Sequence, residues 1–127
     1  MTMLIVDDNA KMRRFVRSAI GDLANEIHEG SDGSEAVALY AEHHPDWLVM
    51  DIAMPVLDGI AATRRIKQNS PEARIIILTV FDDPALRQEA REAGACAYVL
   101  KEDLLHLRRT LIDAVTKPDP TPDPGAC

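Results

Sequence analysis

The runs MLIV at residues 3–6 and WLVM at residues 47–50 decide the fold class of this chain. Each run is short, continuous and apolar, which is typical of strands that are buried on both faces, as in a parallel sheet. The runs Ile75–Leu78 and Cys96–Leu100 have the same character. The more polar segment Glu26–Glu29 is expected to form an edge strand. The sequence therefore predicts five strands.

Helical patterns separate these strands. The first helix is indicated by apolar residues at the spacing i, i+3, i+4, i+7 and i+8, which places them on one helix face. These residues are Met12, Phe15, Val16, Ala19 and Ile20. We expect Asn9 to cap the start of this helix and Gly21 to close its end.

Four more helices are expected between and after the remaining strands. They lie near residues 34–43, near residues 59–68, along Leu86, Ala90 and Ala93, and along Leu104, Leu107, Leu111 and Val115. Asp83 before Pro84 and Gly94 mark the two ends of the fourth helix, and Asp103 is the expected cap of the fifth. This alternation predicts a doubly wound α/β fold with a five-stranded parallel sheet in the order 2-1-3-4-5.

Length and composition fit one compact domain. The chain has 127 residues, of which 46% are hydrophobic. The formal net charge of -7 argues against a free-standing nucleic-acid binder, which would need a basic face. The chain has no apolar run of about 18 residues and no signal-peptide pattern, so we expect no membrane span and a cytoplasmic protein.

The segment KPDPTPDPGAC at residues 117–127 has a different character. Proline occupies every second position from 118 to 124, which excludes a helix and a central strand. We therefore expect a folded domain over residues 1–116 and an extended, proline-rich tail or linker stub over residues 117–127.

Chemically useful side chains lie at the predicted strand ends. In an open α/β sheet, ligands bind at the carboxyl ends of the strands where the strand order reverses, here between the first and third strands. Asp7 and Asp8 follow the first strand, Asp51 the third, Thr79 ends the fourth and Lys101 follows the fifth. Three clustered carboxylates repel one another unless a cation binds, and oxygen ligands without His or Cys favour Mg²⁺. With a hydroxyl and an ammonium beside them, these groups suit phosphoryl transfer to a carboxylate.

Each of these residues also has a plainer interpretation when it is taken alone. Asp7 and Asp8 could serve only as a helix cap, Thr79 as an ordinary strand residue and Lys101 as a solvated surface lysine. Their joint occurrence at the ends of four predicted strands favours the site. The histidines have no ligand spacing and are expected on the surface: His28, His43, His44 and His106.

Four motifs in order carry a family resemblance. LIVDDN at residues 4–9, MDIAMPVLDG at 50–59, IIILTV at 75–80 and YVLKED at 98–103 resemble the motif set of two-component response regulator receiver domains. The resemblance runs from about residue 2 to 116 and implies a flavodoxin-like fold similar to that of chemotaxis regulators. The stretch DIAMPVLDGIAATRRIK at residues 51–67 resembles that of receivers fused to a DNA-binding helix-turn-helix domain, so an effector domain could be absent from this chain.

The resemblance implies a role for each site residue. Asp51 would accept the phosphoryl group from the phosphohistidine of a histidine kinase or phosphotransfer protein. Asp8 and Asp51 would ligate Mg²⁺ directly together with the carbonyl of Ala53, and Asp7 would act through water. Lys101 would pair with the phosphoryl group. Such a domain is no conventional enzyme, because it catalyses only its own phosphorylation and dephosphorylation.

The resemblance also implies a switch. Thr79 would hydrogen-bond the phosphoryl group in the active state, and Tyr98 would turn into the space that Thr79 leaves. The surface formed by residues 84–115 would then change its affinity for an output protein or effector domain that the sequence does not name. A homodimer through this surface on phosphorylation is a further expectation.

The chain departs from the family pattern at two places. Glu102 stands where many receivers have a proline that follows a cis peptide bond. A cis bond before a residue other than proline costs about 2.5–4 kcal/mol. The sequence therefore leaves open whether the bond after Lys101 is cis or trans. Val80 and Phe81 are bulkier than the Ala or Gly that often follows the threonine. We hypothesise that they limit the access of water to the acyl phosphate and slow its hydrolysis.

Two other functions compete with the receiver switch. A small Mg²⁺-dependent phosphatase would also use an aspartyl phosphate, but such enzymes usually have a second acid two residues after the nucleophile, where this chain has Ala53. A phosphate-independent interaction domain would keep only the fold. The intact set of Asp51, Thr79 and Lys101 argues against that loss of chemistry.

Overall fold

The computed structural model describes residues 1–116, in which strands and helices alternate. The elements are β1 (Thr2–Val6), α1 (Ala10–Ile20), β2 (Glu26–Gly30), α2 (Gly33–His43), β3 (Trp47–Met50), α3 (Gly59–Asn69), β4 (Ile75–Thr79), α4 (Pro84–Ala93), β5 (Ala97–Leu100) and α5 (Leu104–Thr116). The strands are all parallel and follow the order β2-β1-β3-β4-β5. This confirms the predicted flavodoxin-like fold, while the predicted proline-rich tail lies outside the described residues.

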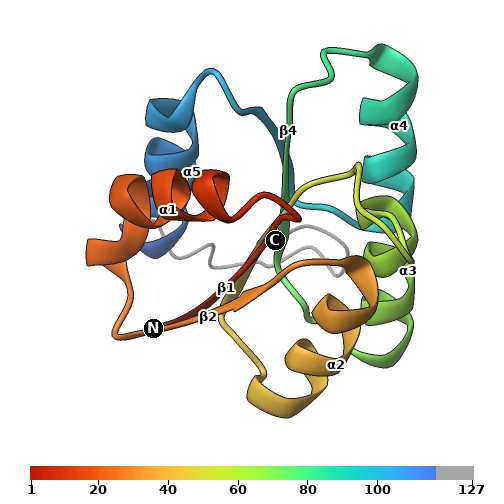
Figure 1. Cartoon of the computed structure of the whole chain (residues 1–127), viewed down its shortest axis with the longest axis horizontal. Coiled ribbons are helices and arrows are strands. Elements are labelled where there is room, and N and C mark those ends of the chain that lie inside the picture. The colour runs from red at the N-terminus through yellow and green to blue at the C-terminus, as the bar shows by residue number, and fades with distance from the viewer. Residues whose placement is uncertain (117–127) are drawn as a thin grey trace.

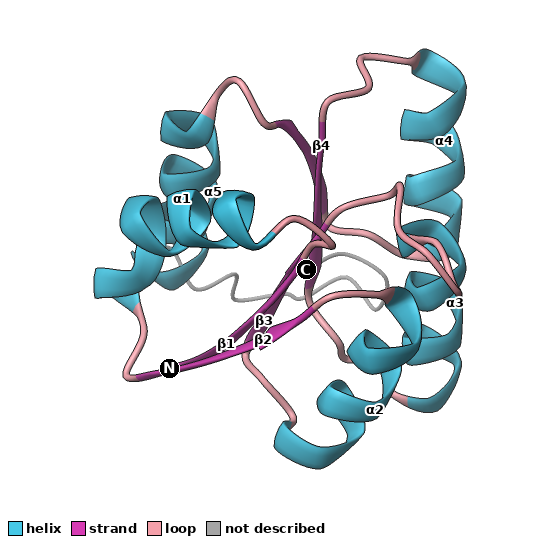
Figure 2. Ribbon diagram, in the orientation of Figure 1, coloured by secondary structure: helices cyan, strands magenta, loops and turns pink. Residues whose placement is uncertain are grey.

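The sheet is a middle layer with helices on both sides (Figures 1 and 2). Helices α1 and α5 cover one face, and α2, α3 and α4 cover the other. Both faces of β1, β3 and β4 are therefore removed from water, which explains their continuous apolar runs. The predicted edge strand is β2, whose residues are less buried than those of the central strands.

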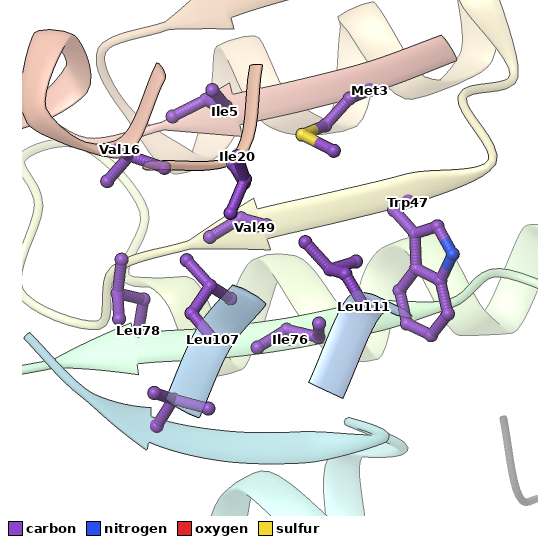
Figure 3. Packing of buried hydrophobic residues seen from close by; sticks show 11 residues of the cluster. Met3, Ile5, Val16, Ile20, Trp47, Val49, Ile76, Leu78, Leu107 and Leu111 are labelled. Atoms are coloured by element: carbon purple, nitrogen blue, oxygen red, sulfur yellow. The ribbon is translucent and has the colours of Figure 1, made fainter. Parts of the chain in front are cut away.

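Alternate residues of the strands build the core against α1 and α5. Successive side chains of a strand point to opposite faces, so every second residue contributes to one cluster. Figure 3 shows this cluster, which contains Met3, Ile5, Val16, Ile20, Trp47, Val49, Ile76, Leu78, Leu107 and Leu111. Each buried aliphatic side chain contributes roughly 1.5–3 kcal/mol relative to its exposed state. Trp47 is only 2% exposed and is therefore a packing residue of this cluster.

The remaining strand residues face α2, α3 and α4. These include Leu4, Val6, Leu48, Met50, Ile75 and Ile77. Small helical residues, Ala36, Ala62 and Ala90, let the helices approach the sheet closely. The result is an aliphatic core on both faces that holds the strand ends in fixed positions.

The helix ends follow the predicted signals. The side chain of Asn9 accepts hydrogen bonds from two N–H groups in the first turn of α1, and Asp83 does the same for α4. Asp103 caps α5 by accepting a hydrogen bond from the N–H of His106 at 3.0 Å. Gly94 ends α4 with a φ of 108°, a conformation that favours glycine.

The structure confirms the expected end of α1 but not the expected position of Phe15. Gly21 closes the helix, its N–H donating to the carbonyl of Arg17, although its φ of -62° is right-handed and it also begins a 3-10 turn, Gly21–Leu23. Phe15 is 52% exposed, although Val16 and Ile20 are buried. Each residue advances a helix by about 100°, so Phe15 lies roughly 120° from the direction midway between Val16 and Ile20. It therefore stands at the border of the apolar face.

The four histidines differ in how far their side chains are exposed. His28 on β2 and His43 at the end of α2 are half-buried, and their rings stack with centroids 3.6 Å apart. His44 and His106 are exposed, as expected.

None of the helices in residues 1–116 has the length and apolar character needed to cross a membrane.

Candidate functional site

The predicted carboxylates meet where the strand order reverses. The N–H of Asp51 donates to the carbonyl of Val6 at 3.1 Å, which fixes the end of β3 beside the end of β1. One carboxylate oxygen from each of Asp7, Asp8 and Asp51 lies within 4.8 Å of the others. Asp7 and Asp51 are 3% and 6% exposed, whereas Asp8 is exposed. The cluster thus has a buried floor and one side that is open to solvent.

Lys101 joins this cluster from the end of β5. Its Nζ lies 2.8 Å from Oδ2 of Asp7 and 2.9 Å from Oδ2 of Asp51. The side chain is 15% exposed, so both ion pairs are largely shielded from water. The structure therefore brings together four of the five residues predicted at the strand ends, and Lys101 bridges the two buried acids.

Burial and charge both act on the ionisation of this cluster. Burial raises the pKa of Asp51 above its ordinary value, the hydrogen bond from Lys101 opposes that increase, and the negative charge of Asp7 adds to it. Burial alone would lower the pKa of Lys101, but its hydrogen bonds to the two carboxylates outweigh burial and raise that pKa. Lys101 is therefore held as a cation between two acids.

The cluster fits a hard divalent cation. It offers only carboxylate oxygens, the ligands that Mg²⁺ prefers, and it holds three acids against one ammonium. The second oxygen of Asp51 accepts a hydrogen bond from the N–H of Ile52 at 2.7 Å, which orients the carboxylate. Ala53, the predicted carbonyl ligand, is an exposed residue of the loop that follows Asp51.

Thr79 lies at the end of β4, where it was predicted, but its hydroxyl is engaged elsewhere. The side chain is wholly buried, and its oxygen accepts a hydrogen bond from the N–H of Phe81 at 3.3 Å. Within residues 1–116 no hydrogen bond joins Thr79 to Asp51. The backbone of the loop between β4 and α4 therefore holds the hydroxyl in this state.

Tyr98 contacts the same loop from β5. Its hydroxyl donates to the carbonyl of Phe81 at 2.6 Å, and the guanidinium carbon of Arg87 lies 4.6 Å from the ring centroid. Phe81 thus bonds to Thr79 through its N–H and to Tyr98 through its carbonyl. One peptide segment connects the two predicted switch residues, a link that the sequence alone did not indicate.

The turn after Lys101 is formed without a cis bond. No cis peptide occurs in residues 1–116, and the N–H of Asp103 donates to the carbonyl of Leu100 at 2.9 Å. The N–H of Lys101 also donates to the carbonyl of Thr79 at 2.9 Å. Glu102 is therefore accommodated in a trans turn, and Lys101 still reaches the acids.

Gly59 supports the site through its backbone, a role that the sequence did not reveal. A Cβ atom at Gly59 would lie 1.9 Å from the carbonyl oxygen of Asp51. The N–H of Gly59 donates to the carbonyl of Ile52 at 2.9 Å, so the start of α3 packs directly on the backbone that carries the acceptor. The glycine after Asp58 was the available signal, but close packing is only one of several reasons for a glycine there.

The arrangement matches a known family. The sequence matches the family of the response regulator receiver domain over residues 3–112, a range that includes all of the predicted site residues. The chain belongs to the response regulator receiver domain family. Receivers are phosphoacceptor switches of two-component systems. They generally bind Mg²⁺ at an acidic pocket and interact with histidine kinases or phosphotransfer proteins and with output domains.

Relatives of this receiver include both short and long proteins. It is 39% identical to the chemotaxis protein CheY of Bacillus subtilis over 100 residues, and this aligned region covers 78% of this chain and 83% of that protein. It is 34% identical to the response regulator MprA of a Mycobacterium species over 98% of this chain, but it spans only 55% of MprA. A LuxR-family response regulator from an Aurantimonas species superposes with a TM-score of 0.83 at 36% identity, over 91% of this chain and 84% of that one.

Proposed function

We propose that Asp51 of this receiver accepts a phosphoryl group from the phosphohistidine of a histidine kinase or phosphotransfer protein. The observation that carries the proposal is the placement of Asp51 in a buried cluster with Asp7 and Lys101, open to solvent on the side of Asp8. The exposed position of Asp8 leaves a side of the cluster from which a phosphoryl donor can approach Asp51. We take residues 1–116 as the receiver unit and residues 117–127 as a tail or linker.

The chemistry requires a nucleophile and groups that balance its charge. A carboxylate oxygen of Asp51 forms a bond to phosphorus while the P–N bond of the phosphohistidine breaks. The imidazole keeps the electron pair and takes a proton from water. Lys101, already bonded to Asp51, is placed to pair with the incoming phosphoryl oxygens. The chain thereby catalyses its own phosphorylation. Attack of water on the phosphorus of the acyl phosphate then breaks the bond to the Asp51 oxygen, releases inorganic phosphate and restores the carboxylate.

The same cluster would hold Mg²⁺. Asp8, Asp51 and the carbonyl of Ala53 would be its direct ligands, and Asp7 would act through water. Bound Mg²⁺ supplies positive charge for the phosphoryl oxygens and relieves the repulsion among the acids. Support comes from the three carboxylate oxygens that already lie within 4.8 Å of one another.

The deciding experiment is intact-protein mass spectrometry after incubation with Mg²⁺ and acetyl phosphate or phosphoramidate. One phosphoryl adduct that needs Mg²⁺ is expected in the parent and none in Asp51→Asn. Asp113→Asn, on the exposed side of α5, is the matched control and should form the adduct like the parent. An adduct that persists in Asp51→Asn would refute the assignment of the acceptor.

Phosphorylation would be transmitted through the loop between β4 and α4. When Thr79 turns to the phosphoryl group, its hydrogen bond to Phe81 breaks, and the carbonyl of Phe81 loses the position in which it accepts from the hydroxyl of Tyr98. Repacking of the surface of residues 84–115 would change its affinity for an output protein or effector domain, or for a second receiver.

This route is tested with Tyr98→Ala. The variant should still form the adduct, but the change in amide hydrogen exchange of α4 caused by beryllofluoride and Mg²⁺ should be lost. Tyr98→Phe, which removes only the bond to the carbonyl of Phe81, should keep part of the response. A full response in Tyr98→Ala would exclude this residue from the switch.

The lifetime of the phosphoryl group is proposed to depend on Val80. This residue and Phe81 are 67% and 41% exposed in the loop that follows Thr79. Bulk at this position would limit the access of water to a phosphoryl group bonded by Thr79. Val80→Ala should therefore lose its phosphoryl group faster than the parent. A rate equal to the parent rate or slower, measured as the decay of the adduct, would contradict this proposal.

A further inference from the structure

Arg13 links the acidic cluster to the edge of the sheet without touching a carboxylate of the cluster. It lies in the first turn of α1, and its side chain is 18% exposed. One guanidinium nitrogen, Nη1, donates to the backbone carbonyl of Asp7, and Nε donates to Oε1 of Glu29 on β2 at 3.0 Å. In the described residues Lys101 is the only cation within ion-pair distance of the carboxylate of Asp7.

The carbonyl of Asp7 belongs to the peptide group that joins Asp7 to Asp8. A hydrogen bond to this oxygen fixes the plane of that peptide and hence the directions in which both side chains leave the backbone. Asp7 is bonded at every polar group, since its N–H donates to Gly30 and its two carboxylate oxygens accept from Asn9 and Lys101.

Asp8 lacks such support. Its exposed carboxylate makes no hydrogen bond or ion pair with the part of the chain that the structure describes. Its position is therefore set by the backbone, and the Asp7–Asp8 peptide is the part of the backbone that Arg13 holds.

Glu29 orients Arg13 for this task. Glu29 pairs in register with Ile5, one residue before the end of β1, so its side chain lies beside the turn that carries Asp7. It accepts from Arg13 and also pairs with Nη2 of Arg17 at 3.4 Å. A guanidinium presents its donors in a rigid fork, which lets Arg13 serve the carboxylate and the carbonyl at once.

We propose that Arg13, oriented by Glu29, is a positioning residue of the Mg²⁺ site, which presents Asp8 to the ion by fixing the Asp7–Asp8 peptide. This inference rests on the proposed function, since it concerns the same metal site. Partners outside the ligand set commonly change metal affinity by 10–100-fold when they are removed.

Isothermal titration of the purified chain with Mg²⁺ tests the proposal. Arg13→Met removes the donors and keeps much of the apolar stem, and it should weaken Mg²⁺ binding about tenfold. Arg17→Met is the matched control, because Arg17 shares the helix and the partner Glu29 but does not contact Asp7. It should stay within about twofold of the parent, a change too small to reflect a lost outer partner. Glu29→Gln should fall between them.

A second measurement separates positioning from general destabilisation. In Arg13→Met the Mg²⁺ concentration for half-maximal phosphorylation should rise, while the rate at saturating Mg²⁺ should stay near that of the parent. Arg13→Lys, which keeps the charge but reaches only one of the two acceptors, should give a smaller loss of affinity. It also replaces Arg13→Met if circular dichroism shows that the latter is unfolded.

The outcomes are distinct. Unchanged Mg²⁺ affinity in Arg13→Met, or an equal loss in Arg17→Met, would overturn the positioning role while leaving the proposed function intact. Failure of the parent itself to bind Mg²⁺ and to form the adduct would instead refute the proposed function, and the role of Arg13 with it.

Discussion

Lys67 on α3 and Lys101 after β5 lie near opposite ends of the parallel strands, which we call the amino edge and the carboxyl edge of the sheet, and each ammonium contacts two acceptors. Lys67, at the amino edge, donates to the carbonyls of Pro71 and Ala73 at 2.6 and 2.9 Å. Lys101, at the carboxyl edge, contacts the carboxylates of Asp7 and Asp51 at 2.8 and 2.9 Å. Burial lowers the pKa of Lys67, with Glu72 opposing it, whereas the carboxylates outweigh burial and raise the pKa of Lys101.

The difference separates a structural edge from a functional one. At the amino edge, a cation closes the turn between α3 and β4 by bonding neutral backbone groups. At the carboxyl edge, a cation balances acids that repel one another and that would have no reason to be gathered for stability alone. Charge that is concentrated and incompletely balanced is what a site for a cation and a phosphoryl group needs.

The largest effect is expected from removal of Lys101. Lys101→Met leaves two buried carboxylates without their cation, which should lower the free energy of unfolding by about 3–5 kcal/mol in metal-free buffer. Lys67→Met loses two hydrogen bonds to carbonyls and should cost only about 1 kcal/mol. Urea denaturation of both variants measures the difference, and equal losses would show that the two edges are alike. Added Mg²⁺ should reduce the loss of stability relative to the parent only in the Lys101 variant, because only there does the ion replace a missing positive charge.

Glycines at the two edges give the next comparison. Gly59→Ala places a methyl group against the backbone of Asp51, 1.9 Å from its carbonyl oxygen, and should cost about 3 kcal/mol. Gly94→Ala at the amino edge faces a positive φ and the flexible end of Lys67, and should cost about 1–2 kcal/mol. Thermal unfolding measures both, and adduct formation should fall only in Gly59→Ala. Loss of the adduct in Gly94→Ala would contradict the separation of the edges.

Neutralising one acid at each edge should change the free energy of unfolding in opposite directions. Asp8→Asn removes one of three repelling carboxylates and should raise the free energy of unfolding in metal-free buffer by about 0.5–2 kcal/mol. Asp46 at the amino edge accepts from the N–H of Thr2 at 2.7 Å, so Asp46→Asn should lower it by about 0.5–1 kcal/mol. Both are read from urea midpoints. Destabilisation by Asp8→Asn would mean that repulsion among the three carboxylates does not reduce the stability of the folded chain.

The smallest effect concerns the pH dependence at Lys67. Because folding lowers the pKa of Lys67 from 10.5, the unfolded chain binds this proton more tightly in the range just below that value. The contribution of Lys67 to stability should therefore be full above pH 10.5 and be lost as the pH falls through the folded pKa. The difference in unfolding free energy between parent and Lys67→Met should increase from pH 8 to pH 10.5. A decrease would mean that the two carbonyls outweigh burial.

Sequence patterns determined most of this fold, because the deciding signals are local. A strand that is buried on both faces needs an apolar side chain at every position, as in Trp47–Met50, and a helix start needs a cap such as Asn9 or Asp83. The site residues could also be predicted, because each one stands at or directly after the carboxyl end of a strand. In a parallel sheet these ends lie together, so the strand order was enough to place the acids, Thr79 and Lys101 near one another.

Tertiary structure decided which partner each polar group found. Local spacing cannot show that Lys101 bridges Asp7 and Asp51, that Thr79 bonds Phe81 instead of the acceptor, or that Arg13 reaches a backbone carbonyl. Such contacts depend on the distances between elements that are remote in sequence, and these distances are fixed only when the two apolar layers have packed on the sheet.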